Sequence, residues 1–224
     1  MDIYYLILVI PALILSIYAQ ARVTSTFKKY SGVLSRSNVS GSYAAQNVLQ
    51  NAGVQGVHIH PINGSLTDHY DPRNNSIGLS EPVHSNTSVA AIGVAAHEAG
   101  HAVQYANGYA PIKIRNTVLP IAQIGCSAAF PIAILGIFLS MPFLIDFGII
   151  LYGAVVLFQA ITLPVEFNAS RRALAALSSS GILAPDELAG AKKVLSAAAL
   201  TYVAATLTTL MSFLRLILLS RNRR

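Results

Sequence analysis

Long apolar runs alternate with a single polar stretch along this chain. Residues 3–19 carry no charged side chain, and the run Val118–Pro164 contains no Lys or Arg and one acid, Asp146. A helix crosses the hydrocarbon core of a bilayer with about 20 apolar residues, so the first run suffices for one crossing. The second run would be about 70 Å long as one helix. Residues 117–164 are therefore predicted to form a transmembrane hairpin that turns near residues 140–146.

The first apolar run has two interpretations. The tripeptide at 19–21, Ala-Gln-Ala, resembles a signal-peptide cleavage site. However, no Lys or Arg precedes the run, whereas Arg22, Lys28 and Lys29 follow it. Positive side chains favour the cytoplasmic side of a membrane. We therefore expect residues 1–21 to be a retained transmembrane anchor with its N-terminus outside.

The polar stretch, residues 22–116, contains all six histidines. Residues 40–53 have the pattern of a short amphipathic helix ended by a glycine. The alternation over residues 54–62 and the short run 76–80 predict two strands, whereas residues 63–75 are dense in turn formers. This stretch is predicted to hold a small sheet and its covering helices.

Two helices are predicted after the hairpin. Residues 165–182 form the first, and residues 183–224 form a long apolar helix with Pro185 near its start. The stretch 196–214 is apolar enough to cross a membrane. A fourth crossing would place the basic tail, Arg221–Arg224, opposite the other basic segments, against the positive-inside tendency. The sequence leaves open whether this helix crosses.

Composition supports a membrane protein and narrows its partners. Charged residues make up 11% of the 224 residues, against about 25% in a soluble domain. The net charge of +6 comes from basic residues that flank apolar runs, so anionic lipid headgroups are the expected partner and nucleic acid is not. The single cysteine, Cys126, excludes an internal disulfide framework and a cysteine-based zinc site.

The chemistry is concentrated in residues 94–104, VAAHEAGHAVQ. Ser88 is placed to cap a helix through this segment. On a helix, His97 and His101 are offset by about 40° and 6 Å, so both imidazoles can bind one ion. Glu98 lies about 100° round from His97, where it can accept a proton from water activated by that ion. This is the His-Glu-x-x-His arrangement of zinc peptidases.

A third zinc ligand is required, because a catalytic zinc usually has three protein ligands and one water. Glu166 is the favoured candidate, since a carboxylate next to an apolar segment is otherwise costly. Its alternative role is to pair with Arg171 or Arg172, or with the dipole of its helix. The other candidates are acids and histidines of the polar stretch: His58, His60, His69, His84, Asp68 and Asp71.

Further polar residues have structural or binding interpretations. Asp71 and Arg73 are expected to form a structural pair in a turn, and the strand 76–80 is expected at a sheet edge that can pair with an extended peptide. His58 and His60 share one face of the predicted strand, as a solvated pair or as a second metal site. Gly100 costs about 1 kcal/mol relative to Ala within a helix, which indicates a packing or functional reason for it.

Two longer segments, LTDHYDPRNNSIGLSEPVHSNTSVAAIGVAAHEAGHAVQ and LPVEFNASRRAL, resemble the YugP-type family of membrane-bound neutral zinc metallopeptidases. That family is similar to the HtpX-type proteases and the wider gluzincin group, and the likeness covers nearly the whole chain. It implies a mainly α membrane protein whose zincin-like (gluzincin) α+β core is joined to about three or four transmembrane helices.

The resemblance also implies roles for particular residues. His97, His101 and Glu166 would bind one Zn²⁺, and Glu98 would be the catalytic base. The chain departs from the family at Asn168, where similar proteins tend to have Asp. If that position supports a zinc-bound histidine, Asn168 accepts a hydrogen bond but adds no charge.

We therefore expect an integral membrane zinc endopeptidase in a prokaryotic inner or plasma membrane, with its active site on the cytoplasmic side. Its substrates would be polypeptides, in particular membrane proteins. One alternative is a catalytically silent zinc-binding scaffold. Another is a metal-binding or transport protein, which would need polar ligands within the spans. The hairpin offers only Gln123, Asp146 and Gln159 for that purpose.

Overall fold

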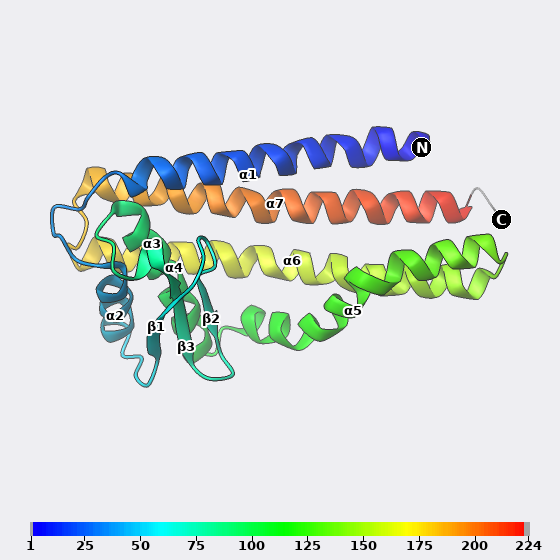
Figure 1. Cartoon of the computed structure of the whole chain (residues 1–224). Coiled ribbons are helices and arrows are strands. Elements are labelled where there is room, and N and C mark those ends of the chain that lie inside the picture. Colours follow the sequence, from blue (N-terminus) through cyan, green and yellow to red (C-terminus); the bar gives the residue numbers. More distant parts are fainter. Residues whose placement is uncertain (1, 222–224) are drawn as a thin grey trace. The chain divides into compact units, whose positions relative to one another are not determined.

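The structure is a computed structural model that describes residues 2–221, and these form long helices and one small sheet (Figure 1). Two compact units can be distinguished. The apolar unit contains the first 20 residues, Ala110–Pro164 and the chain from Leu200 onward, and the catalytic-motif unit contains Ala21–Tyr109 and Val165–Ala199. The elements are a π-helical turn Tyr5–Val9, α1 Ile10–Ser31, α2 Gly41–Asn51, β1 His58–Ile62, β2 His69–Asp71, β3 Ser76–Ser80, α3 Glu81–His84, α4 Val89–Ala106, α5 Ala110–Phe138, α6 Pro142–Ser179 and α7 Pro185–Arg221.

Within residues 2–221, four helices are long and apolar enough to cross a membrane: Tyr5–Ser31, Ala110–Phe138, Pro142–Ser179 and Pro185–Arg221. This confirms the predicted mainly helical fold and gives four candidate spans, where three or four were expected. Helices α5 and α6 are separated by residues 139–141 only, which agrees with the predicted turn of the hairpin.

The apolar unit joins the start of α1 to the end of α7. Arg215 forms an ion pair with Asp2, with 2.7 Å between Nη2 and Oδ2, and its guanidinium carbon lies 5.0 Å from the centre of the Tyr5 ring. Further along, the hydroxyls of Ser16 and Thr208 are 3.0 Å apart. Helix α7 thus pairs with α1 over several turns, and by its length and apolar composition it is a further candidate span.

Helix α6 differs from the two separate helices expected around residue 165. It runs without interruption from Pro142 to Ser179, with Pro164 in its interior. Proline lacks an N–H, so one hydrogen bond to the carbonyl four residues earlier is lost. Close packing of the next turn on α4, at Ala169 and Gly100, helps to offset that loss. The residues that follow Pro164, including Glu166, are thereby carried on a continuous helix.

The sheet has three strands in the order β1-β3-β2, with β3 in the middle (Figure 1). Strand β1 runs parallel to β3 and β2 antiparallel to it. The two predicted strands are confirmed, but the expectation that residues 76–80 lie at a sheet edge is wrong, because both sides of β3 are paired. The short strand β2 lies within a stretch expected to be turns, since three polar residues give no alternation to detect.

Helix α4 forms the centre of the catalytic-motif unit. The hydroxyl of Ser88 accepts a hydrogen bond from the backbone N–H of Ala91 at 3.2 Å, which confirms the predicted cap. Small side chains dominate the buried face of α4, and their size lets neighbouring backbones approach closely. The buried alanines are Ala90, Ala91, Ala95, Ala96, Ala99 and Ala102.

The closest of these approaches is at Gly100, which explains the glycine noted in the sequence. A Cβ at Gly100 would lie 2.7 Å from the carbonyl oxygen of Ala169 on α6. A backbone atom cannot move aside as a flexible side chain can. At Gly93, about two turns earlier on the same helix, the nearest atom to an added Cβ is the Cβ of Ala191, at 3.3 Å.

Gly100→Ala is predicted to separate α4 from α6, lowering the free energy of unfolding by about 1–3 kcal/mol and weakening zinc binding. Gly93→Ala is the matched control, because it is the same change on the same helix. At Gly93, the gain of about 1 kcal/mol in helix propensity should offset the small shift of Ala191 that an added Cβ requires. Thermal unfolding and zinc titration in detergent measure both effects. Wild-type zinc affinity in Gly100→Ala would contradict the predicted separation.

Candidate metal centre

Helices α4 and α6 bring together the three residues that the sequence identified as metal ligands. One side-chain ligand atom from each of His97, His101 and Glu166 lies within 4.8 Å of the others. Oε2 of Glu166 is 3.2 Å from Nε2 of His97 and 3.5 Å from Nε2 of His101. The two imidazoles meet edge to face, with ring centres 4.7 Å apart. Residues 69 positions apart in the chain thus share one site.

The donor set fits a zinc ion. Two imidazole nitrogens and one carboxylate oxygen are the ligands that catalytic zinc takes, with a fourth position left for water or substrate. The side chain of Glu166 is 3% exposed, and a buried carboxylate requires a cation or strong hydrogen-bond donors around it. Among the described residues 2–221, the other candidate metal ligands do not belong to the cluster of His97, His101 and Glu166. They are His58, His60, His69, His84, Asp68 and Asp71.

His97 and His101 each have a further hydrogen-bond partner at the other ring nitrogen, Nδ1. Nδ1 of His101 lies 3.1 Å from Oε1 of Gln104, and Nδ1 of His97 lies 3.1 Å from the hydroxyl of Ser170. These contacts leave both Nε2 atoms facing Glu166. Gln104 and Ser170 were not among the site residues predicted from the sequence. Gln104 lies three residues after His101, and Ser170 lies four residues after Glu166. Each is therefore on the same helix face as a predicted ligand, and this spacing is the signal that could have identified them.

Asn168, the departure from the family pattern, contacts neither of the predicted histidine ligands through a hydrogen bond. Its Oδ1 accepts hydrogen bonds from Nε2 of Gln104 at 2.9 Å and from Nε of Arg172 at 2.8 Å. The side chain at position 168 therefore reaches His101 only through Gln104. The missing negative charge at position 168 therefore acts on the buried amide of Gln104, and not directly on His97 or His101.

Glu98 lies on α4 next to His97 and is 8% exposed. Burial raises the pKa of its carboxyl to about 7; the charge of His97 lowers it in part, and the nearby carboxylates of Glu166 and Asp68 add to the rise. A cation held by the three ligands would favour the ionised form. A carboxyl in this position can both accept and release a proton near neutral pH.

The segment around β2 has a structural role. Oδ1 of Asp68 accepts hydrogen bonds from the backbone N–H of Ser80 at 2.8 Å and from its hydroxyl at 3.0 Å, which fixes the end of β3. Asp71 and Arg73 form the expected pair, with 2.7 Å between Oδ2 and Nη2. Hydrogen bonds from Arg73 lower the pKa of the Asp71 carboxyl to about 2.

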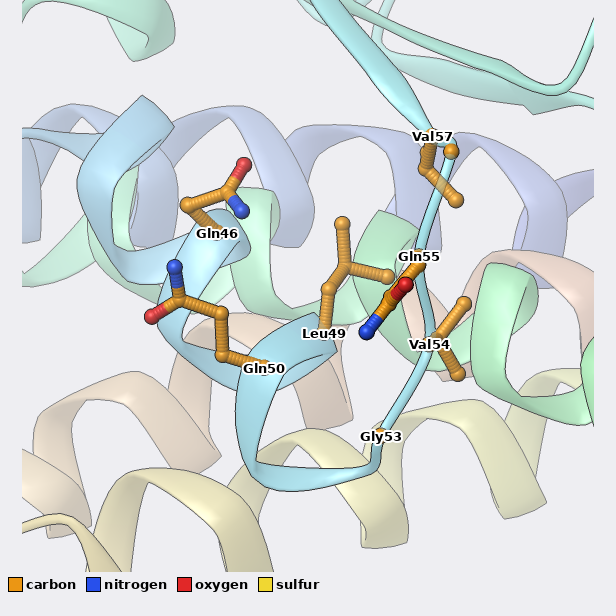
Figure 2. Close-up of a pocket in the computed structure, with 8 residues that line it drawn as sticks. Gln46, Leu49, Gln50, Gly53, Val54, Gln55 and Val57 are labelled. Atoms are coloured by element: carbon orange, nitrogen blue, oxygen red, sulfur yellow. The ribbon is translucent and has the colours of Figure 1, made fainter.

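A separate hollow of about 330 Å³ lies between α2 and the segment that follows it (Figure 2). None of the predicted site residues lines it, and its walls carry amide and apolar side chains rather than titratable ones. Figure 2 shows Gln46, Leu49 and Gln50 on α2, with Val54 and Gln55 on the following segment. The composition of these walls gives no support for catalysis.

Comparison with known proteins agrees with the geometry. Residues 5–221 match the model of a family described as "Putative neutral zinc metallopeptidase". The chain is 44% identical over 220 residues to "Putative membrane protease YugP" of Bacillus subtilis (strain 168), covering 98% of each chain. No solved structure matches significantly.

Glu166→Gln is predicted to lower zinc affinity at least about 100-fold, because removal of a direct ligand should exceed the loss of about 10–100-fold typical of its supporting residues. Glu81→Gln, at an exposed glutamate of the same unit, is the control and should bind zinc as wild type does. Metal content after purification and competition with a chelator measure the affinity. Equal binding by the two variants would exclude Glu166 as a ligand.

Proposed function

The chain belongs to the family of neutral zinc metallopeptidases, and we propose that it is a membrane-embedded zinc endopeptidase with a gluzincin-type core. Its substrates in this proposal are membrane proteins or polypeptides close to the membrane. The observation that carries the proposal is the convergence of His97, His101 and Glu166, with Glu98 beside them. The name of the Bacillus subtilis relative, which describes a membrane protease, points to the same function.

His97, His101 and Glu166 would hold the zinc. When bound, zinc supplies a Lewis acid that lowers the pKa of water and polarises a peptide carbonyl. His101 and Glu166 are buried and His97 is only partly exposed, which limits the access of competing solvent to the reaction. The two imidazoles stay oriented because their Nδ1 atoms are hydrogen-bonded to Gln104 and Ser170.

Glu98 is proposed to move the proton. As the water oxygen bonds to the peptide carbonyl carbon, Glu98 takes up the proton of that water. When the carbon–nitrogen bond breaks, Glu98 delivers the proton to the leaving nitrogen. A pKa raised by burial suits both halves of this task, since the carboxyl must accept a proton and then release it. The reaction consumes one water per peptide bond.

The proposed location is a prokaryotic inner or plasma membrane, with the metal centre on the cytoplasmic side. Four apolar helices support membrane insertion. Arg22, Lys28 and Lys29 follow the first apolar run, and positive residues favour the cytoplasm. Peptide bonds close to that membrane surface are then the accessible substrates. A transporter is less consistent with these features, because the ligand cluster lies within the catalytic-motif unit and not among the polar residues of the hairpin.

Glu98→Gln is predicted to retain zinc and to lose cleavage of an unfolded protein by at least about 100-fold, the contribution typical of a general base. The assay uses the full chain in detergent, with and without a chelator, and zinc added back should restore the wild-type rate. Glu81→Gln is the control for a glutamate change outside the site. Zinc-loaded wild type that cleaves nothing would leave the silent scaffold as the better description.

The orientation can be tested with single cysteines in a Cys126→Ala background. Asn51→Cys on α2 is predicted to react with a membrane-impermeant thiol reagent only after cells are permeabilised. Met141→Cys, in the exposed turn between α5 and α6, should react in intact cells. The opposite labelling pattern would place the metal centre on the outer side of the membrane.

A further inference from the structure

We infer that Gln104 is a positioning residue that fixes the tautomer of His101, so that Nε2 of His101 presents its lone pair to the metal. The inference rests on the proposed function only for the identity of the site as a zinc centre. It concerns a hydrogen-bond network of Gln104, Val165, Asn168 and Arg172 that links α4 to α6 behind the ligands.

The orientation of the Gln104 amide follows from its partners. Gln104 is fully buried, so water does not compete for its hydrogen bonds. One end of the amide lies 2.8 Å from the backbone carbonyl oxygen of Val165, which can only accept. That end must be the NH₂ group. The oxygen of the amide therefore faces His101, with 3.1 Å between Oε1 and Nδ1.

Asn168 strengthens the same orientation. Nε of Arg172 can only donate, and it lies 2.8 Å from the side chain of Asn168, so the oxygen of Asn168 faces it. The same oxygen lies 2.9 Å from Nε2 of Gln104, which gives the NH₂ group a second acceptor. The network thus has a fixed direction, because neither the carbonyl of Val165 nor the guanidinium of Arg172 can exchange its role.

The consequence falls on His101. An amide oxygen accepts and does not donate, so Nδ1 of His101 must carry the hydrogen. A neutral imidazole has only one N–H, which leaves the lone pair on Nε2. That atom is the one 3.5 Å from Oε2 of Glu166, inside the ligand cluster. Gln104 therefore prepares His101 as a metal ligand before any ion arrives.

His97 lacks a partner of this kind. The Nδ1 atom of His97 faces the hydroxyl of Ser170 at 3.1 Å, and a hydroxyl can donate or accept by rotating. Ser170 can steady the ring but does not impose a tautomer. Loss of Gln104 should therefore cost more zinc affinity than loss of Ser170. This difference separates a positioning role from general support of the site.

Gln104 also sets the position of the third ligand. Its NH₂ group bonds to Val165 and Asn168, the residues on either side of the Glu166–Phe167 pair on α6. One side chain of α4 thereby holds the helical turn that carries Glu166. Any change at position 104 acts on two of the three ligands, whereas a change at Ser170 acts on one.

The test compares zinc affinities of full-length variants in detergent by competition with a chelator. Gln104→Met keeps the length of the side chain and removes its hydrogen bonds, and zinc affinity is expected to fall about 10–100-fold. Ser170→Ala should lose less than about 10-fold. The absorption spectrum of the Co²⁺-loaded protein should change in Gln104→Met and stay close to wild type in Ser170→Ala.

Gln104→Glu tests the direction of the network. Its carboxylate still accepts from Nδ1 of His101, but its second oxygen faces the carbonyl oxygen of Val165 and Oδ1 of Asn168, which both accept, so zinc affinity should stay below that of wild type. Asn168→Ala is the structural control, because it removes the two hydrogen bonds that Asn168 accepts while Gln104 keeps its bonds to Val165 and His101, and its zinc affinity should fall less than that of Gln104→Met. Thermal unfolding of the metal-free proteins checks folding. Should Gln104→Met not fold, Gln104→Asn, which withdraws the amide by one methylene, takes its place.

Each outcome is decisive. Wild-type zinc affinity in Gln104→Met or in Gln104→Glu, or an equal loss in Ser170→Ala, overturns the role of Gln104 while leaving the proposed function intact. Wild type that binds zinc but cleaves no polypeptide overturns the proposed function and leaves the affinity comparison valid. Wild type that binds no zinc overturns both.

Discussion

The close approach of α4 to α6 is the constraint on which the candidate metal centre depends. His97 and His101 flank Gly100 on α4, and Glu166 lies one turn before Ala169 on α6. Only a residue without Cβ allows the two backbones to come this near, since an added carbon would lie 2.7 Å from a carbonyl oxygen. The spacing of the ligand atoms is therefore set by a contact that involves no ligand. A metal site built across two helices requires such a rigid support.

The parts of this arrangement that depend on local spacing could be predicted from sequence. The paired histidines, the adjacent glutamate and the capping serine lie within 14 residues on one helix, and helical geometry relates them directly. The third ligand could not be derived in this way. Spacing left Glu166 with alternative roles, and the resemblance to a known family singled it out. Nothing in the local pattern of α4 specifies which distant turn packs against Gly100.

Other features were missed or misjudged because they depend on distant partners. Gln104 stands in the quoted motif, yet its importance arises from Val165 and Asn168, about 60 residues later. The central position of β3 depends on β2, which is too short for its pattern to be recognised. Helix α6 continues past Pro164, and the close packing of its next turn on α4 at Gly100 is a contact that the local sequence does not reveal.

The catalytic-motif unit is discontinuous in sequence, and this orders the events of its biosynthesis. His97 and Glu166 are 69 residues apart, with the helical hairpin of α5 and the first part of α6 between them. At about 5–20 residues per second, the ribosome adds Glu166 roughly 3–14 s after His97. Throughout that interval the nascent chain holds His97, Glu98 and His101 but lacks Glu166, the third proposed ligand. The three proposed ligands are thus not all present until the apolar hairpin between them has been made, whereas α7 is still to follow.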